Sequence, residues 1–165
     1  MVNADSVYIE LQKHLDKQAV GFPATKSGVE IRILKELFNP EQANLALHLN
    51  YEPQSARDIF NRVKGVGISL KQVKLLLEEM VSNGAIMVTE KSGTGYYFTM
   101  PLLVGIVEMH GARATPQFWM DFNEYSRGEF GRAYANTKVS QMRTIPVEKS
   151  IQVEHQVASR MGGVD

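Results

Sequence analysis

Histidine, the side chain best suited to acid–base chemistry and metal binding, occurs at four scattered positions, His14, His48, His110 and His155. No second histidine or group of carboxylates accompanies any of them in a pattern typical of a metal or catalytic site, so we favour packing or surface roles. The chain has no cysteine, which excludes disulfides and thiolate chemistry. We therefore expect no catalytic, cofactor-binding or metal-binding residue here, and no enzyme activity of this chain.

Two glycine-containing segments were considered as phosphate or anion sites. Gly65-Val66-Gly67 lacks the further Gly and the Lys of a phosphate loop, and it follows a predicted helix instead of a strand. Backbone amides of Ser92–Gly95 offer an anion site, but glycines at a hairpin tip need no ligand to explain them. We interpret both segments as turns.

The segment Leu70–Ser82 combines an apolar side with a polar side. Spacing of 3.6 residues per turn predicts a buried side formed by Leu70, Val73, Leu76, Leu77 and Met80. The remaining residues are then predicted to form an outward face of Lys71, Gln72, Lys74, Leu75, Glu78, Glu79 and Ser82. In a DNA-binding helix-turn-helix the second helix would present cations and base-edge donors here, whereas this face is mixed in sign.

Turn chemistry predicts the elements that position this face. Ser69 with Gln72 forms a capping box at the start of the helix, and Asn83-Gly84 predicts its end. Ser55, with Asp58 three residues later, starts a preceding short helix that ends at Lys64–Gly67, so the pair predicts a helix-turn-helix.

A helix before this pair and a hairpin after it complete a recognisable order. Asn39-Pro40, with Gln42, predicts the start of the earlier helix. The β-prone runs Ala85–Glu90 and Tyr96–Met100 predict a hairpin, and Pro101 stops it. Its expected wing tip consists of Lys91, Ser92, Gly93, Thr94 and Gly95. Residues 40–100 are therefore predicted to be a winged helix-turn-helix.

The flanking segments predict more helices. Apolar spacing indicates one from Asp5 to about Lys17 and one over Val29–Phe38; Leu102–His110 and a segment starting at Thr115-Pro116 follow the hairpin. We expect the latter two to pack on the winged helix. The fold class is thus mainly α (α+β), with residues 1–135 as one domain and 136–165 as an extended arm or linker.

Aromatic residues are concentrated after Thr115, at Phe118, Trp119, Phe122, Tyr125, Phe130 and Tyr134. Phe118, Phe122 and Tyr125 fall on one helical face, so we favour core packing over a dimer interface or a stacking platform.

Overall charge gives no general attraction to nucleic acid. Lys plus Arg and Asp plus Glu each total 18, and the pI is about 6.9. Residues 51–100 hold six cations and five anions, and a net charge of one is too small to indicate a phosphate-binding surface. We favour a protein-interaction module, with a DNA-binding transcriptional regulator as the alternative.

The longest apolar run, Leu102–Val107, is too short to span a bilayer and no leader pattern opens the chain, so we expect a cytoplasmic protein without a membrane partner.

Several stretches together resemble the N-terminal part of a family of anaerobe ferredoxin-like proteins that bind four-iron, four-sulfur clusters. The opening stretches are Gly21-Phe22-Pro23, Ser27-Gly28-Val29-Glu30, Ile33-Leu34-Lys35, Leu37-Phe38 and Ala46-Leu47-His48-Leu49. The later ones are Leu76-Leu77-Glu78-Glu79-Met80, Gly95-Tyr96-Tyr97, Val104-Gly105-Ile106-Val107-Glu108 and the segment Arg143–Ile151.

The resemblance, over about Tyr8–Ile151, implies an N-terminal winged-helix part of a 4Fe-4S electron-transfer protein. In this family a segment with Cys-x-x-Cys-x-x-Cys runs follows and ligates the clusters, and no such ligand exists in this chain. We therefore expect an N-terminal fragment or domain, cut near Gly162–Asp165. Its expected partners are a protein or its own ferredoxin domain, with a homodimer as a further alternative and DNA disfavoured.

Overall fold

The computed structural model describes residues 5–18 and 20–137. Within them the helices are α1 (Ser6–Leu15), α2 (Val29–Leu37), α3 (Pro40–Ala46), α4 (Ala56–Val63), α5 (Leu70–Ser82), α6 (Val107–His110), α7 (Pro116–Arg127) and α8 (Glu129–Ala135). A small antiparallel sheet has the strand order β1-β3-β2, from β1 (Gln54–Ser55), β2 (Met87–Lys91) and β3 (Thr94–Phe98). The fold is mainly helical and belongs to the α+β class. His155 and nearly all of the predicted arm lie outside the described residues.

Local capping explains why several helices begin where they do. The Asn39 side chain accepts a hydrogen bond from the Gln42 amide at 2.9 Å, and the Gln42 side chain accepts one from the Asn39 amide at 3.0 Å. Ser69 and Gln72 form the same reciprocal pair at the start of α5. The Thr115 hydroxyl accepts a hydrogen bond from the Phe118 amide at the start of α7. These starts agree with the sequence predictions.

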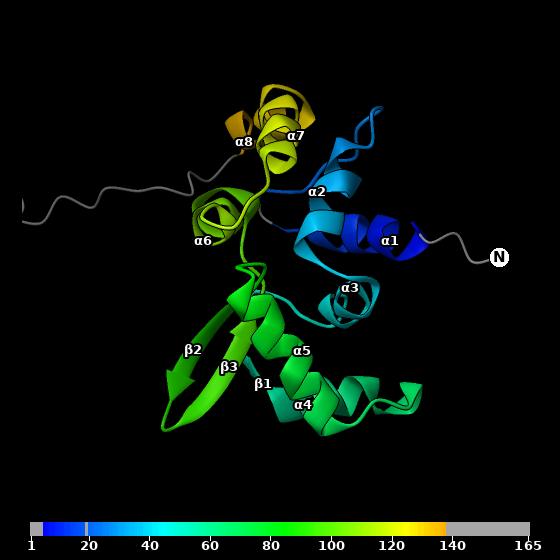
Figure 1. Ribbon diagram of the computed structural model, residues 1–165, viewed down its shortest axis with the longest axis vertical. Helices are drawn as coiled ribbons and strands as arrows, with labels where there is room; N and C mark the ends of the chain where they lie inside the picture. The colour runs from blue at the N-terminus through cyan, green and yellow to red at the C-terminus, as the bar shows by residue number, and fades with distance from the viewer. Residues whose placement is uncertain (1–4, 19, 138–165) are drawn as a thin grey trace, which may run out of the picture.

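The elements lie in two groups joined by α3 and α6 (Figure 1). Helices α1, α2, α7 and α8 gather at one end of the molecule, whereas α4, α5 and the sheet gather at the other. One hydrophobic core runs through both groups and includes Leu11, Leu34, Ile59, Leu77 and Phe118. No helix in the described part of the chain is long and apolar enough to cross a membrane.

Of the two later helices that we expected on residues 40–100, one packs elsewhere. Helix α6 does contact that segment, because His110 bonds to Asn83 and the Met109 backbone lies against Gly84, whereas α7 packs against α2, and α8 packs against α7. Phe118, Tyr125 and Phe130 are fully buried there, so the core-packing interpretation is confirmed for these three aromatic residues. Trp119 differs, because 42% of its surface remains exposed.

Two predicted elements were wrong in detail. Leu102–His110 is not one helix, because Leu103 is extended and Val104 has a φ of 60°. The Glu108 carboxylate holds this kink by accepting hydrogen bonds from the Val104 and Gly105 amides, and only Val107–His110 forms a regular helix.

The hairpin turn is also shorter than predicted. Ser92 and Gly93 alone form it, both with positive φ, as in the type I′ turns that match strand twist. Lys91 pairs with Thr94, and Gly95 pairs with Glu90, so three of the five predicted tip residues belong to strands. Strand β1, which pairs with β3, was not predicted.

The loop after α5 is the point where the two groups of elements meet. The Asn83 side chain donates a hydrogen bond to the Leu37 carbonyl at 2.8 Å, and the Asn83 carbonyl accepts one from His110 Nδ1 at 2.7 Å. Gly84 has a φ of 74°, and a Cβ there would lie 2.5 Å from the Met109 carbonyl carbon. Only glycine fits at position 84, because a larger residue would clash with the backbone of Met109 and His110.

Replacing Gly84 tests this junction, and Gly93 provides a matched control. Gly93 has a nearly equal φ of 73° but open space around it. Gly93→Ala is expected to lower the free energy of unfolding by about 1–2 kcal/mol, through backbone strain alone. Gly84→Ala is expected to lose at least about 1–3 kcal/mol more, because it also forces a backbone clash. Urea unfolding measures both, and equal losses would contradict the close passage.

Candidate functional site

The outward face of α5 is the surface that both the sequence and the structure single out. Val73, Leu76, Leu77 and Met80 are buried beneath the helix. The predicted outward residues Lys71, Gln72, Lys74, Leu75, Glu78 and Glu79 are all exposed. Leu75, in the middle of this face, has 55% of its surface exposed, so no other described element covers it. Single exposed apolar side chains are common on protein surfaces, so Leu75 alone does not mark a site.

The ends of α5 are fixed tightly, so its outward face is presented rigidly. Gly67, with a φ of 79°, turns the chain before the helix, and the Ser69 capping box begins it. The Asn83 backbone amide closes the last turn on Glu79, and the Asn83–Gly84 junction anchors the helix to α2 and α6. The face therefore keeps one orientation relative to the rest of the molecule.

A groove of about 600 Å³ runs beside this face, between α3 and α5. Its apolar lining comes from Leu45, Leu47, Val63, Ile68, Leu75 and Leu76. Its polar lining comes from Glu41, Asn44, His48 and Gln72. No sequence pattern predicts this groove, because residues of α3 and of the loop before α5 reach it only through tertiary packing.

Two lining or neighbouring groups have shifted pKa values. Burial, together with the charges of Arg62 and His14, lowers the pKa of His48, so its imidazole favours the neutral form. Burial raises the pKa of Tyr97 on β3, and the nearby Glu78 carboxylate adds to this effect. Neither shift creates a reactive group, because burial is the main cause of both.

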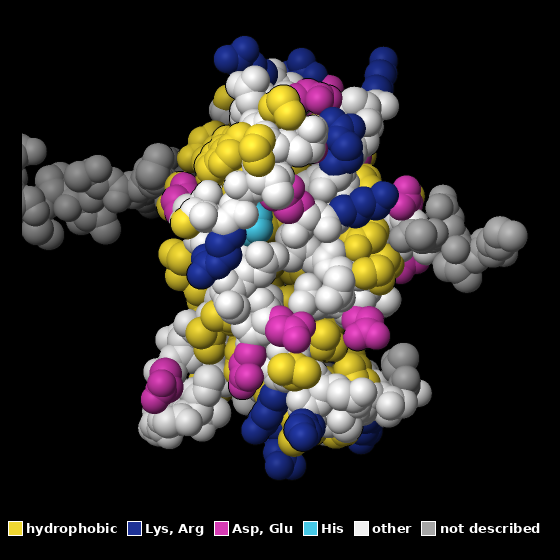
Figure 2. Space-filling view, viewed as in Figure 1, with side chains coloured by type: hydrophobic (Ala, Val, Ile, Leu, Met, Phe, Trp, Pro, Cys, Tyr) yellow, Lys and Arg dark blue, Asp and Glu magenta, His cyan; other side chains and the backbone are white. Residues whose placement is uncertain are grey.

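Charges on the α5 face are ordered along the helix. Lys71 and Lys74 precede Leu75, whereas Glu78 and Glu79 follow it. Lys and Arg side chains gather at the end of the molecule formed by α4 and α5, with Asp and Glu side chains above them (Figure 2). Glu79 is held by Gln42 of α3, whose Nε2 donates to Glu79 Oε2 at 3.1 Å. The face thus has a cationic end, an apolar centre and an anionic end.

The predicted wing tip lies on a different element from this face. Lys91, Ser92, Gly93, Thr94 and Gly95 lie at the end of the β2–β3 hairpin, which points toward the same end of the molecule as the start of α5, to one side of that helix (Figure 1). A Cβ at Gly95 would contact Tyr97 and Val88, so packing within the hairpin accounts for this glycine.

The described histidines do not assemble a site. His14 Nε2 lies 2.7 Å from the Leu49 carbonyl, and His110 is buried between Asn83 and Glu36. Within residues 5–18 and 20–137, no group of three or more His, Asp or Glu side chains is placed to hold a metal ion.

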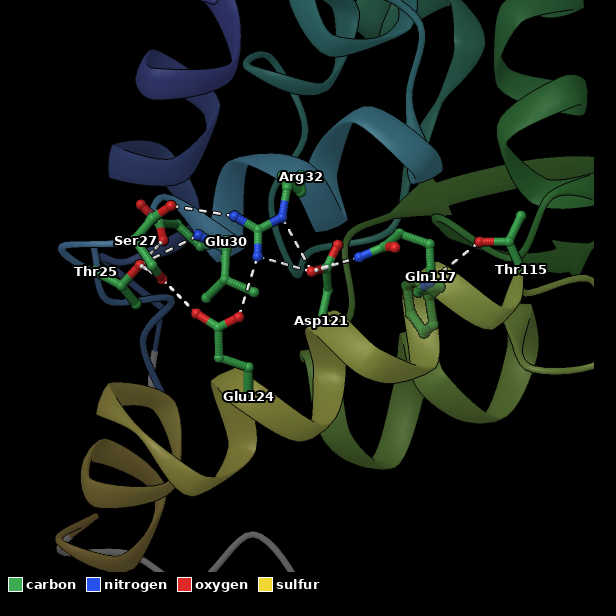
Figure 3. A network of polar contacts seen from close by, with 10 residues as sticks. Thr25, Ser27, Glu30, Arg32, Thr115, Gln117, Asp121 and Glu124 are labelled. Atoms are coloured by element: carbon green, nitrogen blue, oxygen red, sulfur yellow. Dashed lines mark hydrogen bonds and ion pairs between the residues drawn. The ribbon is translucent and has the colours of Figure 1, made fainter.

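A polar network that the sequence did not predict holds α7 on α2 (Figure 3). Arg32 of α2 donates from Nε and Nη2 to Asp121 Oδ1, at 3.0 and 2.8 Å, and from Nη2 to Glu124 Oε2 at 3.1 Å. Gln117 also donates to Asp121, which is buried. Ser27 donates to Glu124, so the loop before α2 joins the network. Asp121 and Glu124 lie 89 and 92 positions from Arg32 in sequence, and Glu124 lies 97 positions from Ser27, so no local pattern relates them. The network is structural: it fixes the helices that surround the α5 junction.

Comparison with known proteins adds no relative: no protein-family model, no curated protein and no solved structure matches the chain. The structural class of the protein is therefore described from its fold and its candidate site. The chain is a mainly helical α+β protein whose most distinctive surface is an exposed, charge-ordered helix beside an apolar groove.

Replacing the two carboxylates that bind Arg32 tests the α2–α7 network. Asp121→Ala is expected to lower the free energy of unfolding by about 1.5–3 kcal/mol, because a buried carboxylate with charged hydrogen bonds is lost. Glu124→Ala is the control, since this side chain is 47% exposed and its ion pair is worth at most about 1 kcal/mol. Urea unfolding compares them; a larger loss for Glu124→Ala would contradict this ranking.

Proposed function

We propose that residues 40–100 form a winged helix-turn-helix. Helices α3, α4 and α5 are followed by the β2–β3 hairpin, and β1 between α3 and α4 adds the third strand, an order that supports this assignment. In such a module α5 is the second helix of the helix-turn-helix, the one that DNA-binding members insert into the major groove.

We propose that this winged helix binds protein, and that it is the accessory domain of a 4Fe-4S ferredoxin-type electron-transfer protein. The observation that carries protein binding is Leu75, 55% exposed at the centre of α5 and bordering the apolar groove. Glu78 and Glu79 on the same face would repel a phosphate backbone. The face is therefore better suited to a protein surface than to a DNA groove.

The iron–sulfur assignment rests on the family resemblance, and the chain's own residues do not fit a cluster. Cluster irons need cysteine thiolates, and the sequence has no cysteine. The clusters therefore belong to another segment of the proposed parent, and this chain contributes contacts only. Electron transfer itself is assigned to that segment.

One observation favours the alternative, a DNA-binding regulator. Lys and Arg side chains gather at the α4–α5 end of the molecule (Figure 2), and Lys71 and Lys74 lie in the first turns of α5. A phosphate backbone could approach α5 from this end. The acidic half of α5 then limits how far the helix enters a groove.

Titration with random duplex DNA separates the two functions. The protein-binding function predicts no association tighter than about 10⁻⁴ M at physiological salt, the weak limit of non-specific DNA binders, and no steep gain in affinity as the salt is lowered. Fluorescence anisotropy of a labelled duplex measures this. Tight binding that weakens steeply with salt, and that Lys71→Ala and Lys74→Ala each reduce, would support the regulator and contradict our proposal.

The reading frame beyond the codon for Asp165 tests the proposed parent. We expect it to continue into a segment with clustered cysteines in Cys-x-x-Cys-x-x-Cys runs, because the clusters require ligands that this chain lacks. Sequencing the gene and its transcript provides the measurement. A stop codon directly after Asp165 would contradict the iron–sulfur assignment and leave the protein-binding function to stand on the α5 face.

A further inference from the structure

The outward face of α5 has a symmetry in its sequence that the proposed function does not explain. Lys71, Leu75, Glu78 and Ser82 follow one another at i, i+4, i+7 and i+11, so they form one continuous stripe along the helix. Lys74 and Glu79 flank this stripe on opposite sides. Lys71 lies four residues before Leu75 and Glu79 four residues after it, so charge reverses about the leucine.

These charges have no ion-pair partner inside the described part of the chain. The salt bridges found there involve Asp5, Glu36, Asp121, Glu124 and Glu129 as acids, and none includes Lys71, Lys74, Glu78 or Glu79. Gln42 gives Glu79 a single hydrogen bond, which orients it without neutralising it. The α5 face thus presents two cations at one end and two carboxylates at the other, with the exposed Leu75 between them.

We propose that the partner of this face is a second copy of the chain, bound through an antiparallel pairing of the two α5 helices about a two-fold axis at Leu75. This inference rests on the proposed protein-binding function and names its partner. The two-fold axis places Leu75 against Leu75 of the partner subunit. In this register Lys71 lies level with Glu79 of the partner subunit, and Glu79 lies level with Lys71 of the partner subunit, so the pair occurs twice. Lys74 and Glu78 of the partner subunit are two positions out of this register, which is within one helical turn.

Other arrangements of the same two helices lack this complementarity. A parallel pairing would bring like charges together along the whole face, which is destabilising. A single partner of uniform charge would be attracted by one half of α5 and repelled by the other. Because the face is its own complement, a second copy satisfies both halves at once.

The groove beside α5 extends the area available for such a pair. A stable dimer buries about 800 Å² on each subunit, more than the stripe of one helix supplies. The apolar lining from Leu45, Leu47 and Ile68 continues the Leu75 surface toward α3. An α5 helix of the second copy, lying across the stripe, would cover the mouth of this groove.

Charge exchange tests the pairing directly, with sedimentation equilibrium as the measurement of dimer dissociation. Lys71→Glu and Glu79→Lys are each expected to weaken the dimer by about tenfold or more at low salt, because each places two like-charged pairs across the axis. The double variant, Lys71→Glu with Glu79→Lys, is expected to recover most of the lost affinity. High salt is expected to narrow these differences.

Leu75→Asp tests the apolar centre, with Met120→Asp as the matched control. Both residues are exposed, at 55% and 58%, so neither substitution should unfold the chain, and circular dichroism verifies this. Leu75→Asp is expected to give a monomer, and Met120→Asp, on α7, is expected to leave the dimer unchanged.

Three results would overturn the pairing: a native chain that stays monomeric up to submillimolar concentration, a dimer insensitive to Leu75→Asp, or a double variant no tighter than the single ones. Each outcome is separate from the DNA titration. A monomer that ignores duplex DNA refutes the pairing and leaves protein binding in place, whereas salt-dependent DNA binding refutes the proposed function itself.

Discussion

Helix α5 can expose a patterned face only because its far end is locked to the rest of the molecule. Gly84 passes against the backbone of Met109 and His110 with no room for a side chain, while Asn83 bonds to the Leu37 carbonyl and to the His110 ring. This passage fixes the direction of α5 relative to α2 and α6. Its apolar side must then face α3 and α4, and the side centred on Leu75 must face outward. The groove, the charge order and the proposed contacts all depend on that orientation.

The parts of the fold that follow local rules could be predicted from the sequence. Asn39, Ser69 and Thr115 each accept a hydrogen bond from an amide three residues ahead, so the signal and the structure lie within one turn. The outward face of α5 followed equally directly from helical spacing, because that helix packs on one side only. Every α5 residue predicted to face outward is exposed, and on the predicted buried side only Leu70 remains half-buried.

The remaining features depend on contacts that no local pattern encodes. Arg32 and Asp121 meet across 89 residues, and the groove forms where α3 approaches α5. Strand β1 is only two residues long, too short for an alternating pattern. At Leu102–Ile106 the apolar run suggested a helix, but the Glu108 side chain captures two backbone amides and stabilises a kink instead. Propensity was overridden there by a specific hydrogen-bonding side chain.

The central claim is that the Leu75 face meets its own copy, and the lack of cysteine in the sequence allows a direct test. Leu75→Cys would carry the only thiol, placed at the proposed two-fold axis, where two cysteines of facing helices come within the short Cα separation that a disulfide needs. Mild oxidation followed by non-reducing electrophoresis measures cross-linking, with Met120→Cys as the reference. The account predicts a rapid, nearly complete covalent dimer for Leu75→Cys and little for Met120→Cys. Equal, slow cross-linking of the two variants would contradict it.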